Sequence, residues 1–226
     1  MRRYTIVFYI YNHQVIACLF SRKNKLVLTL KGLLEFDDSL PSFSAAIDPL
    51  TIIYVVRSLL NRLLASLEGQ RFAIDGISFV THFQGWLAWD RESGQPILPF
   101  IGCEEPSLDR YVKRLAFDQL FRELVRSKSE PDAARRYWAL ALCFQDLLEN
   151  KRVSKQRLVI SSINAWILYH LTGKQVCKTS RSHCYETGIL DRDTGGVDAS
   201  LVAEIPLVEH VLTTLIKPND PELVSH

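Results

Sequence analysis

The residue types best suited to metal binding gather near the C-terminal end of the chain. Cys177, His183 and Cys184 lie within eight residues of one another, and thiolate and imidazole groups are preferred ligands of zinc. A structural zinc site needs a further ligand, usually from a second Cys-x-x-Cys or His pair, and no such pair occurs in the sequence. We therefore expect isolated strand residues here, and no metal site.

Two other chemistries have the residue types but not the pattern. A cysteine nucleophile would need an activating histidine, His82, His170 or His183, and the sequence carries no local signature of such a pairing. Two-metal nucleic-acid cleavage needs several converging carboxylates. The basic pairs 135–136 and 151–152 lie near predicted helix ends, where cations offset the helix dipole or face water. We expect no nucleic-acid partner.

Composition limits the remaining classes. The chain has 226 residues, 47% of them hydrophobic, which is enough for a continuous core in one or two domains. Its formal net charge is only +2, so no strong overall field favours nucleic acid or anionic lipid. The apolar runs are shorter than the roughly 20 residues of a membrane span, and no N-terminal leader pattern is present. We expect a soluble, cytoplasmic protein without a membrane partner.

The N-terminal segments predict an antiparallel sheet. β-Branched and aromatic residues fill 4–10 and 14–20, and a third apolar run, 26–30, follows the polar stretch SRKNK. Short runs of this kind separated by turn residues are typical of hairpins. Asn24 is a candidate for a left-handed turn conformation.

A helix and two strands are predicted next. Asp48 and Pro49 suit the N-cap and the first helical position, and apolar residues recur at helical spacing from there to Gly69. FAIDGISFV and WLAWD then have the character of strands. A strand, a helix and a strand in this order imply a crossover that makes the later strand parallel to an earlier one.

The C-terminal half is mainly helical. Helical periodicity predicts helices within 108–124, 133–148 and 155–171, with Trp166 in the core and Gly173 as the C-terminal cap of the last one. The stretches KQVCKT and CYETGILD are interpreted as short strands and TGGVD as a turn. Together the segments predict an α/β protein with an inserted helical block.

The order of these segments resembles the N-terminal lobe of the FGGY carbohydrate kinase family, which includes glycerol kinases and xylulokinases. The resemblance rests on the helix that ends in Leu171, Thr172 and Gly173, on the segment from Thr187 to Asp191, and on the EIPL that follows. The VIACLF and LVLTL hairpin and the run from ISFV to SGQPILPFI agree in order. It implies a ribonuclease-H-like, actin-like ATPase lobe over 1–215, with a mixed sheet opened by an antiparallel hairpin, and a tail at 216–226.

The resemblance also locates a phosphate-binding turn. In the family an Asp-x-Gly-Thr run lies between the first two strands, and here Tyr9, Ile10, Tyr11 and Asn12 occupy it. Tyrosines replace the carboxylate that helps hold magnesium and the glycine that lets backbone amides approach phosphate. Because phosphoryl transfer depends on positioning and on charge neutralisation, we expect this degenerate phosphate loop not to serve ATP.

Two further matches mark a sugar site. The family's Gln-x-His-Gly loop corresponds to THFQG at 81–85, and its Trp-x-Asp-x-Arg run corresponds to CEEPS at 103–107. The resemblance therefore implies His82, Gln84 and Glu105 as candidate sugar-binding residues, whereas Ser107 lacks the guanidinium. The alternative for the first loop is that its polar side chains are simply solvated.

The resulting hypothesis is a truncated, degenerate carbohydrate kinase-like lobe that acts as a non-catalytic binding or interaction protein. At roughly half the family's length, the chain is expected to lack the nucleotide lobe and its catalytic Asp, and so to have no catalytic residue, metal or cofactor of its own. The alternative is half of a carbohydrate kinase, with ATP and magnesium supplied by a separately encoded nucleotide-binding lobe. A third possibility is a remnant without selected function.

The family resemblance also implies two kinds of binding partner. The first is a sugar or polyol. The other is a protein partner, or a second copy of the chain, bound through the face that corresponds to the interlobe cleft. That face is expected to carry Tyr9, Tyr11, Phe83 and Trp86, because a large aromatic patch seldom stays bare on a soluble monomer.

Overall fold

The computed structural model describes residues 1–11, 13–34, 48–81, 84–128, 130–149, 151, 153–191 and 194–212. The chain divides into two compact units. The described residues of the N-terminal unit lie between 1 and 81, and those of the C-terminal unit lie between 84 and 212. The single lobe expected over 1–215 stays a prediction, and the expected tail at 216–226 lies outside the described residues.

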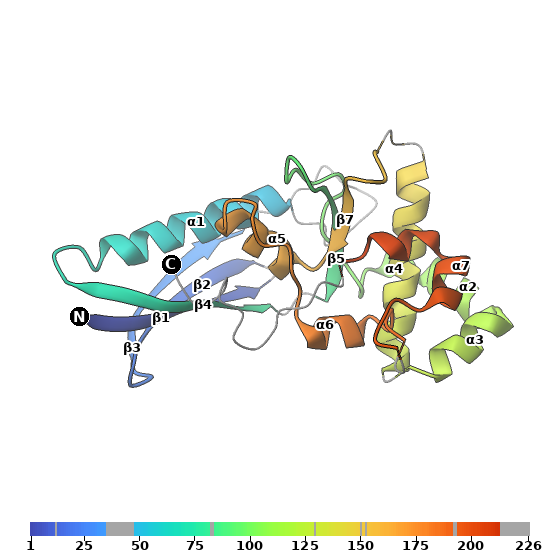
Figure 1. Cartoon of the computed structure of the whole chain (residues 1–226), viewed down its shortest axis with the longest axis horizontal. Coiled ribbons are helices and arrows are strands. Elements are labelled where there is room, and N and C mark those ends of the chain that lie inside the picture. Colours follow the sequence, from blue (N-terminus) through green and yellow to red (C-terminus); the bar gives the residue numbers. More distant parts are fainter. Residues whose placement is uncertain are drawn as a thin grey trace. The chain divides into compact units, whose positions relative to one another are not determined.

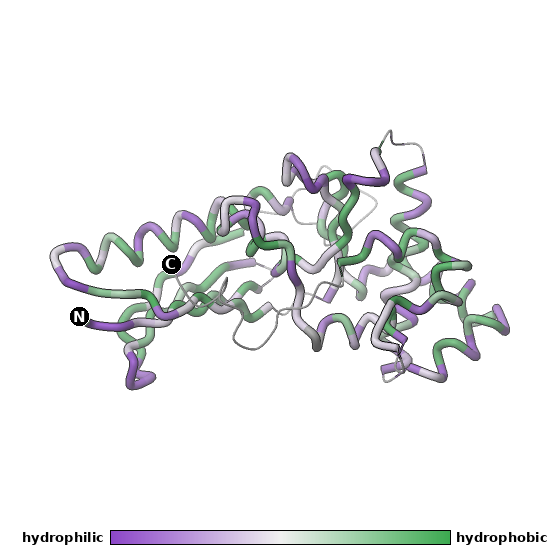
Figure 2. The backbone as a smooth tube through the Cα atoms, viewed as in Figure 1, coloured by the Kyte–Doolittle hydropathy of each residue, from purple (hydrophilic) through white to green (hydrophobic). Residues whose placement is uncertain are grey.

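The N-terminal unit is built on a four-stranded mixed sheet. Its strands are β1 (Arg2–Tyr11), β2 (Gln14–Ser21), β3 (Leu26–Leu33) and β4 (Phe72–Thr81), in the order β3-β2-β1-β4. β2 is antiparallel to both β1 and β3, whereas β4 is parallel to β1. The hairpin and the crossover expected from the sequence are therefore confirmed. Asn24 adopts the left-handed conformation with φ of 55° in the turn between β2 and β3, and the tip of this turn is hydrophilic (Figure 2).

One face of this sheet is covered by α1 (Pro49–Ala65), as Figure 1 shows. Asp48 accepts a hydrogen bond from the Leu50 amide at 2.9 Å and so caps the helix. Alternate residues of β1 are fully buried and the amphipathic helix buries one side, which makes a shared core. A Cβ at Gly32 would lie 2.5 Å from Val55 Cγ1, so glycine lets β3 approach α1 closely.

The C-terminal unit has a small antiparallel sheet and most of the helices. The sheet has the order β6-β5-β7, from β5 (Gly85–Asp90), β6 (Ile101–Gly102) and β7 (Leu158–Ser161). The expected helical block lies between β6 and β7 and comprises η1 (Pro106–Leu108), α2 (Asp109–Phe117), α3 (Gln119–Arg126) and α4 (Pro131–Glu149). The long helix α4 passes through the core, where Trp138 and Phe144 are fully buried.

The rest of this unit consists of short helices. They are α5 (Ile163–Leu171), α6 (Arg181–Glu186), α7 (Ala199–Glu204) and η2 (Pro206–His210). Trp166 on α5 is fully buried, as expected, and Gly173 has the positive φ of a C-terminal cap. None of the described helices is long and apolar enough to cross a membrane.

Three secondary-structure predictions were wrong. The helix expected over 155–171 is instead β7 followed by α5, because LVIS is a β-branched run and the Ser162 side chain caps a helix that begins only at Ile163. CYETGILD does not form a strand, because the Ser180 side chain caps α6. KQVCKT forms no strand either. Cys177, His183 and Cys184 are therefore not strand residues, and no metal-binding group of three was found among the described residues.

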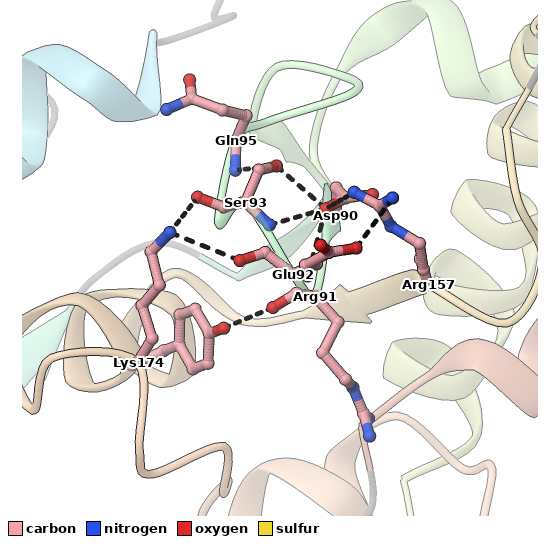
Figure 3. A network of polar contacts seen from close by, with 8 residues as sticks. Asp90, Arg91, Glu92, Ser93, Gln95, Arg157 and Lys174 are labelled. Atoms are coloured by element: carbon pink, nitrogen blue, oxygen red, sulfur yellow. Dashed lines mark hydrogen bonds and ion pairs between the residues drawn. The ribbon is translucent and has the colours of Figure 1, made fainter.

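A polar network holds the end of β5 against the segments that follow it (Figure 3). The Asp90 carboxylate accepts hydrogen bonds from the Ser93 amide at 2.7 Å and from Arg157 at 2.8 Å. The Arg157 hydrogen bond is the main reason why the pKa of Asp90 lies well below its usual value. Lys174 donates to the Ser93 carbonyl at 2.7 Å, and the Trp166 indole donates to the Gly94 carbonyl at 3.0 Å. The network fixes the turn after β5.

Candidate functional site

The two loops marked as sugar-binding are joined through backbone contacts. Gln84 directly precedes β5, and its carbonyl accepts a hydrogen bond from the Cys103 amide at 2.7 Å. Gly85 pairs with Gly102 on β6, and a Cβ at Gly85 would overlap the carbonyl oxygen of Ile101. Glycine therefore permits the close approach of these strands. The pairing of β5 with β6 therefore brings the residue just before β5 close to the residues just after β6.

A pocket of about 140 Å³ lies at this place. The first two turns of α4 form its other wall, because residues three or four positions apart on a helix share a side. Its lining contains an amide, two carboxylates, a guanidinium, a phenol and a thiol, from Gln84, Cys103, Glu104, Asp132, Arg136 and Tyr137, together with Ala133. This set supplies both hydrogen-bond donors and acceptors.

The start of α4 is held in position by two contacts, one with the N-cap of α7 and one with the turn after α6. Lys128, just before the helix, forms a buried ion pair with Asp198, with 2.5 Å between Nζ and Oδ2. Asp198 also caps α7 by accepting from the amides of Ser200 and Leu201. Gly188, with φ of 63°, packs so closely on Ala134 that a Cβ there would lie 2.5 Å from the Ala134 Cβ. These contacts fix the wall that carries Asp132, Arg136 and Tyr137.

The charges around the pocket are largely paired. Arg136 donates to the Cys103 carbonyl at 3.3 Å, and its Nε lies 3.5 Å from a Glu104 carboxylate oxygen. Asp132 pairs with Arg135 at 3.2 Å. Side-chain exposure is 35% for Arg136 but 74% for Glu104, so the guanidinium is the more enclosed of the two. The pocket therefore carries no large excess of positive charge for an anionic ligand.

A layer of buried aromatic rings lies against the pocket residues. The Tyr137 ring packs on Trp86 with centroids 5.0 Å apart and meets the His183 ring edge-on at 5.6 Å. The Trp86 indole donates to His183 Nε2 at 3.3 Å. Burial lowers the pKa of His183 to about 4, so the imidazole is neutral near pH 7 and can accept this bond. α6, which carries His183, belongs to the same unit as α4, and both helices are labelled in Figure 1.

The thiols do not provide an activated nucleophile. Burial raises the pKa of Cys103 well above its usual value, and the nearby Glu104 charge raises it further. Burial also raises the pKa of Cys184 and of Cys143 to about 11. A thiol that stays protonated at neutral pH is a poor nucleophile. Cys103 thus contributes only shape and a weak polar contact to the pocket.

Among the described residues, the structure places only one of the three predicted sugar-binding residues in the lining of the pocket. Gln84 is exposed and lines the pocket. Glu105 is 5% exposed and is not among the lining residues, and its charge contributes to the raised pKa of Cys143 on α4. Its role in sugar binding stays a prediction. His82 lies outside the described residues.

The residues of the degenerate phosphate loop lie in the N-terminal unit. Tyr9 and Tyr11 are half-buried at the end of β1, and Asn12 lies outside the described residues. Of the aromatic residues expected on the exposed cleft face, Phe83 also lies outside the described residues. Trp86 is fully buried, so its assignment to that face was wrong. The apolar pattern of β5 buries all but its last residue, which the resemblance did not reveal.

Four pocket residues were missed from the sequence: Glu104, Asp132, Arg136 and Tyr137. The sequence predicts that Arg136 offsets a helix dipole or faces water, whereas it lines the pocket and donates a hydrogen bond to the Cys103 carbonyl. One signal for these residues was present in the sequence. Pro131 is typical of a first helical position, and the start of α4 determines which residues share a side of its first two turns. The segment after β6, which contains Cys103 and Glu104, gives no sequence signal that it contacts α4.

Known proteins with similar sequences and structures are carbohydrate kinases. The glycerol kinase of Xylella fastidiosa (strain 9a5c) is 26% identical over 185 residues, which are 76% of this chain and 35% of that protein. The crystal structure of Plasmodium falciparum glycerol kinase with ADP matches 99% of this chain and 47% of that chain, with a TM-score of 0.75 and 16% identity. The chain is FGGY carbohydrate kinase-like.

A second solved structure agrees in fold. The ligand-bound xylulose kinase from Lactobacillus acidophilus matches 96% of the chain and 42% of that chain, with a TM-score of 0.74 and 18% identity. The fold of this FGGY-like chain is thus the mixed α/β, actin-like ATPase fold that was expected. No family model matches the chain. The chain spans about a third of the length of the glycerol kinase relative.

Proposed function

We propose that this FGGY-like chain is a non-catalytic lobe that binds a small neutral polyol or sugar in the pocket between β5, β6 and α4. The observation that carries the proposal is that the two loops marked by the family resemblance meet at one pocket, to which α4 adds further polar groups. A polyol offers hydroxyl groups that both donate and accept, and the amide, carboxylates and guanidinium match both functions.

The size and charge of the pocket favour a small neutral compound. A volume of about 140 Å³ corresponds to roughly four to five water molecules, far below the roughly 300 Å³ or more of sites for drug-sized ligands. This volume favours a compound smaller than a nucleotide. The single guanidinium is already paired with Glu104, so phosphorylated or carboxylated sugars gain little from it.

The proposed absence of catalysis rests on the N-terminal unit. By the family resemblance, Tyr9 and Tyr11 correspond to the phosphate-binding carboxylate and glycine, and both lie at the end of β1. A tyrosine provides no magnesium ligand comparable to a carboxylate. Of the described residues, we assign none a catalytic role.

The alternative is one half of a two-chain carbohydrate kinase. It is favoured by the partial match, since this chain aligns with only 35% of the glycerol kinase relative. A second chain carrying a nucleotide-binding lobe would then supply ATP and magnesium. A phosphorylation assay of the isolated chain with magnesium, ATP and glycerol or D-xylulose separates catalysis from binding: we expect no turnover, and measurable turnover would overturn the non-catalytic assignment.

Binding itself is tested by two-dimensional NMR of the full ¹⁵N-labelled chain titrated with glycerol, D-xylulose and D-gluconate. We expect shifts centred on the amides of Gln84, Glu104 and Arg136 for at least one neutral compound, and weaker binding of the carboxylated D-gluconate. Magnesium and ATP should leave the amides of Tyr9 and Tyr11 unshifted. Shifts that avoid the pocket, or no shifts with any of the compounds, would refute the proposed site.

Binding of a protein partner, or of a second copy, through Tyr9 and Tyr11 stays a separate proposal. It rests on their half-buried position at one end of the N-terminal sheet, and on the suitability of tyrosine for interfaces. Sedimentation of the wild type and of a Tyr11→Ser variant measures it. A wild-type monomer at high concentration would remove the self-association part of this proposal.

A further inference from the structure

We propose that the open edge of β3 is a docking site for an extended acidic segment of a partner protein, which adds to the N-terminal sheet as a further strand. Three features carry the proposal: the direction of the backbone groups along β3, the exposure of its apolar side chains, and the charge of the β2–β3 hairpin. The site belongs to the other unit from the pocket, so it goes beyond the proposed function and does not depend on polyol binding.

β3 is an edge strand whose outer side faces no other described strand. It is the first strand in the order β3-β2-β1-β4, and of the described strands only β2 pairs with it. The Leu34 amide donates to the His13 carbonyl at 2.9 Å, so the backbone of Leu34 is directed toward β2. Because this direction alternates along a strand, the N–H and C=O groups of Thr29, Lys31 and Leu33 are directed away from β2. These groups can pair with an added strand.

The side chains of β3 include three exposed apolar residues. Gly32 packs against α1, so Lys31 and Leu33 on either side of it point away from the helix. Leu33 is 77% exposed, and at the other end of the strand Leu26 and Val27 are 57% and 51% exposed. Apolar residues on an open strand edge form a template for pairing with another chain. β3 therefore offers both hydrogen-bonding groups and apolar surface to a partner.

The β2–β3 hairpin also carries an excess of positive charge. Residues 14–34 contain four cations and no Asp or Glu, which gives a formal charge of +4, whereas the whole chain has +2. The cations are Arg22, Lys23, Lys25 and Lys31. All four are exposed, and none of them forms an ion pair with a described residue. Positive charge without a counter-ion from the described chain therefore lies beside the open edge.

This charge favours an acidic partner over a second copy of the chain. Pairing the β3 edges of two copies would bring two hairpins of formal charge +4 together, and like charges oppose such association. A lysine within an edge strand is a common protection against self-pairing. In contrast, a strand with a carboxylate opposite Lys31 and apolar residues opposite Leu33 and Val27 would match both the charge and the apolar surface. The occupant is therefore an extended acidic segment.

The first test measures the affinity of the full-length chain for a fluorescently labelled synthetic peptide by anisotropy. The peptide has about ten residues, in which threonine alternates with valine or glutamate, to suit the length of β3. The wild type and Arg122→Glu, which changes an exposed cation on α3, should bind it with equal affinity. Lys31→Glu should bind it at least about tenfold more weakly, with an unchanged unfolding temperature because the side chain is exposed.

Two control peptides separate strand addition from attraction by charge alone. Replacing glutamate with lysine reverses the charge of the peptide. Replacing every threonine with proline keeps the charge but removes N–H groups that a strand ladder needs. We expect neither control peptide to bind at concentrations that saturate the chain with the parent peptide. Equal affinity for the parent and the proline peptide would overturn strand addition.

Hydrogen exchange of the full ¹⁵N-labelled chain identifies the edge that is used. The parent peptide should slow exchange at the amides of Thr29, Lys31 and Leu33, because their N–H groups are directed outward. Binding without slower exchange at these amides would overturn the assignment to β3. If the wild type does not bind the peptide, the proposal is overturned, and binding of vesicles of phosphatidylcholine and phosphatidylserine would then assign the cations to an anionic lipid surface. Failure of polyol binding would not change these results, so the two failures are distinguishable.

Discussion

Replacing Lys128 with methionine should destabilise the C-terminal unit substantially, because it removes one partner of a buried ion pair. The side chains of Lys128 and Asp198 are only 5% and 12% exposed, and their charged atoms are 2.5 Å apart. Breaking such a pair from one side costs about 3–5 kcal/mol, because the other charge stays buried without its partner. Asp198 would keep its bonds from Ser200 and Leu201, so we expect about 3 kcal/mol.

Urea unfolding monitored by tryptophan fluorescence at pH 7 measures this loss. Arg135→Met is the matched control, since its pair with Asp132 is exposed at the surface and should contribute less than about 1 kcal/mol. In a double-mutant cycle, Lys128→Met combined with Asp198→Asn should cost less than the sum of the two single changes. A loss below about 1 kcal/mol for Lys128→Met would refute the reasoning that the pair anchors the start of α4.

The same pair predicts a pH dependence of known sign. Burial alone would raise the pKa of Asp198, but the hydrogen bond and charge of Lys128 and the capping amides outweigh it, so the pKa is lowered. A carboxylate with a lowered pKa stabilises the fold above its unfolded value of about 3.9 and loses this contribution as the pH falls through the folded pKa. In Lys128→Met, the part of the loss of folding stability at low pH that comes from Asp198 should therefore be smaller.

Two further predictions concern the layer against the pocket and the turn that packs on α4. Because burial lowers the pKa of His183 to about 4, the unfolded chain takes up this proton at higher pH than the folded protein, so stability should fall by about 3 kcal/mol between roughly pH 6.5 and pH 4. Urea unfolding across this range should show that His183→Gln removes most of the slope; an unchanged slope would contradict the assignment. Gly188→Ala should cost about 2 kcal/mol or more, from a positive φ and a Cβ 2.5 Å from the Ala134 Cβ. Gly195→Ala has a similar φ but no neighbour within 4 Å, so its cost should be about 1 kcal/mol, and equal losses for the two variants would argue against the close packing.

The parts of the fold that the sequence predicted are those with a clear local period. The strands of the first hairpin alternate buried and partly buried residues along β1, and the apolar residues of α1 recur at helical spacing. Asp48 caps a helix and Asn24 adopts a left-handed turn conformation, as these residue types often do. Local chemistry and tertiary structure agree at these positions.

The errors arose where periodicity was ambiguous. LVIS, now β7, is buried at every residue, so its apolar run matches a buried helix as well as a strand. The short helix α6 has six residues, too few to show a period, and it depends on the cap formed by Ser180. The residues around Cys184 were therefore predicted as a strand, whereas Cys184 lies on α6.

The candidate site was only partly predictable because it is assembled from distant segments. The resemblance marked Gln84, which lines the pocket, and Glu105, which does not. It had no means of finding Arg136 or Tyr137, whose proximity to Cys103 depends on the packing of α4 against the β5–β6 pair.

The most direct test of the central claim is the affinity of the full-length chain for glycerol and D-xylulose, measured by calorimetry on the wild type, Arg136→Met and Arg122→Met. Arg136 lines the pocket, whereas Arg122 is exposed on α3 and is not among the lining residues. We predict that the wild type and Arg122→Met bind at least one of the two compounds with equal affinity. Arg136→Met should bind it at least about tenfold more weakly, because hydrogen bonds from a charged donor are lost. Equal affinity in all three proteins, or no heat of binding for the wild type, would contradict the account.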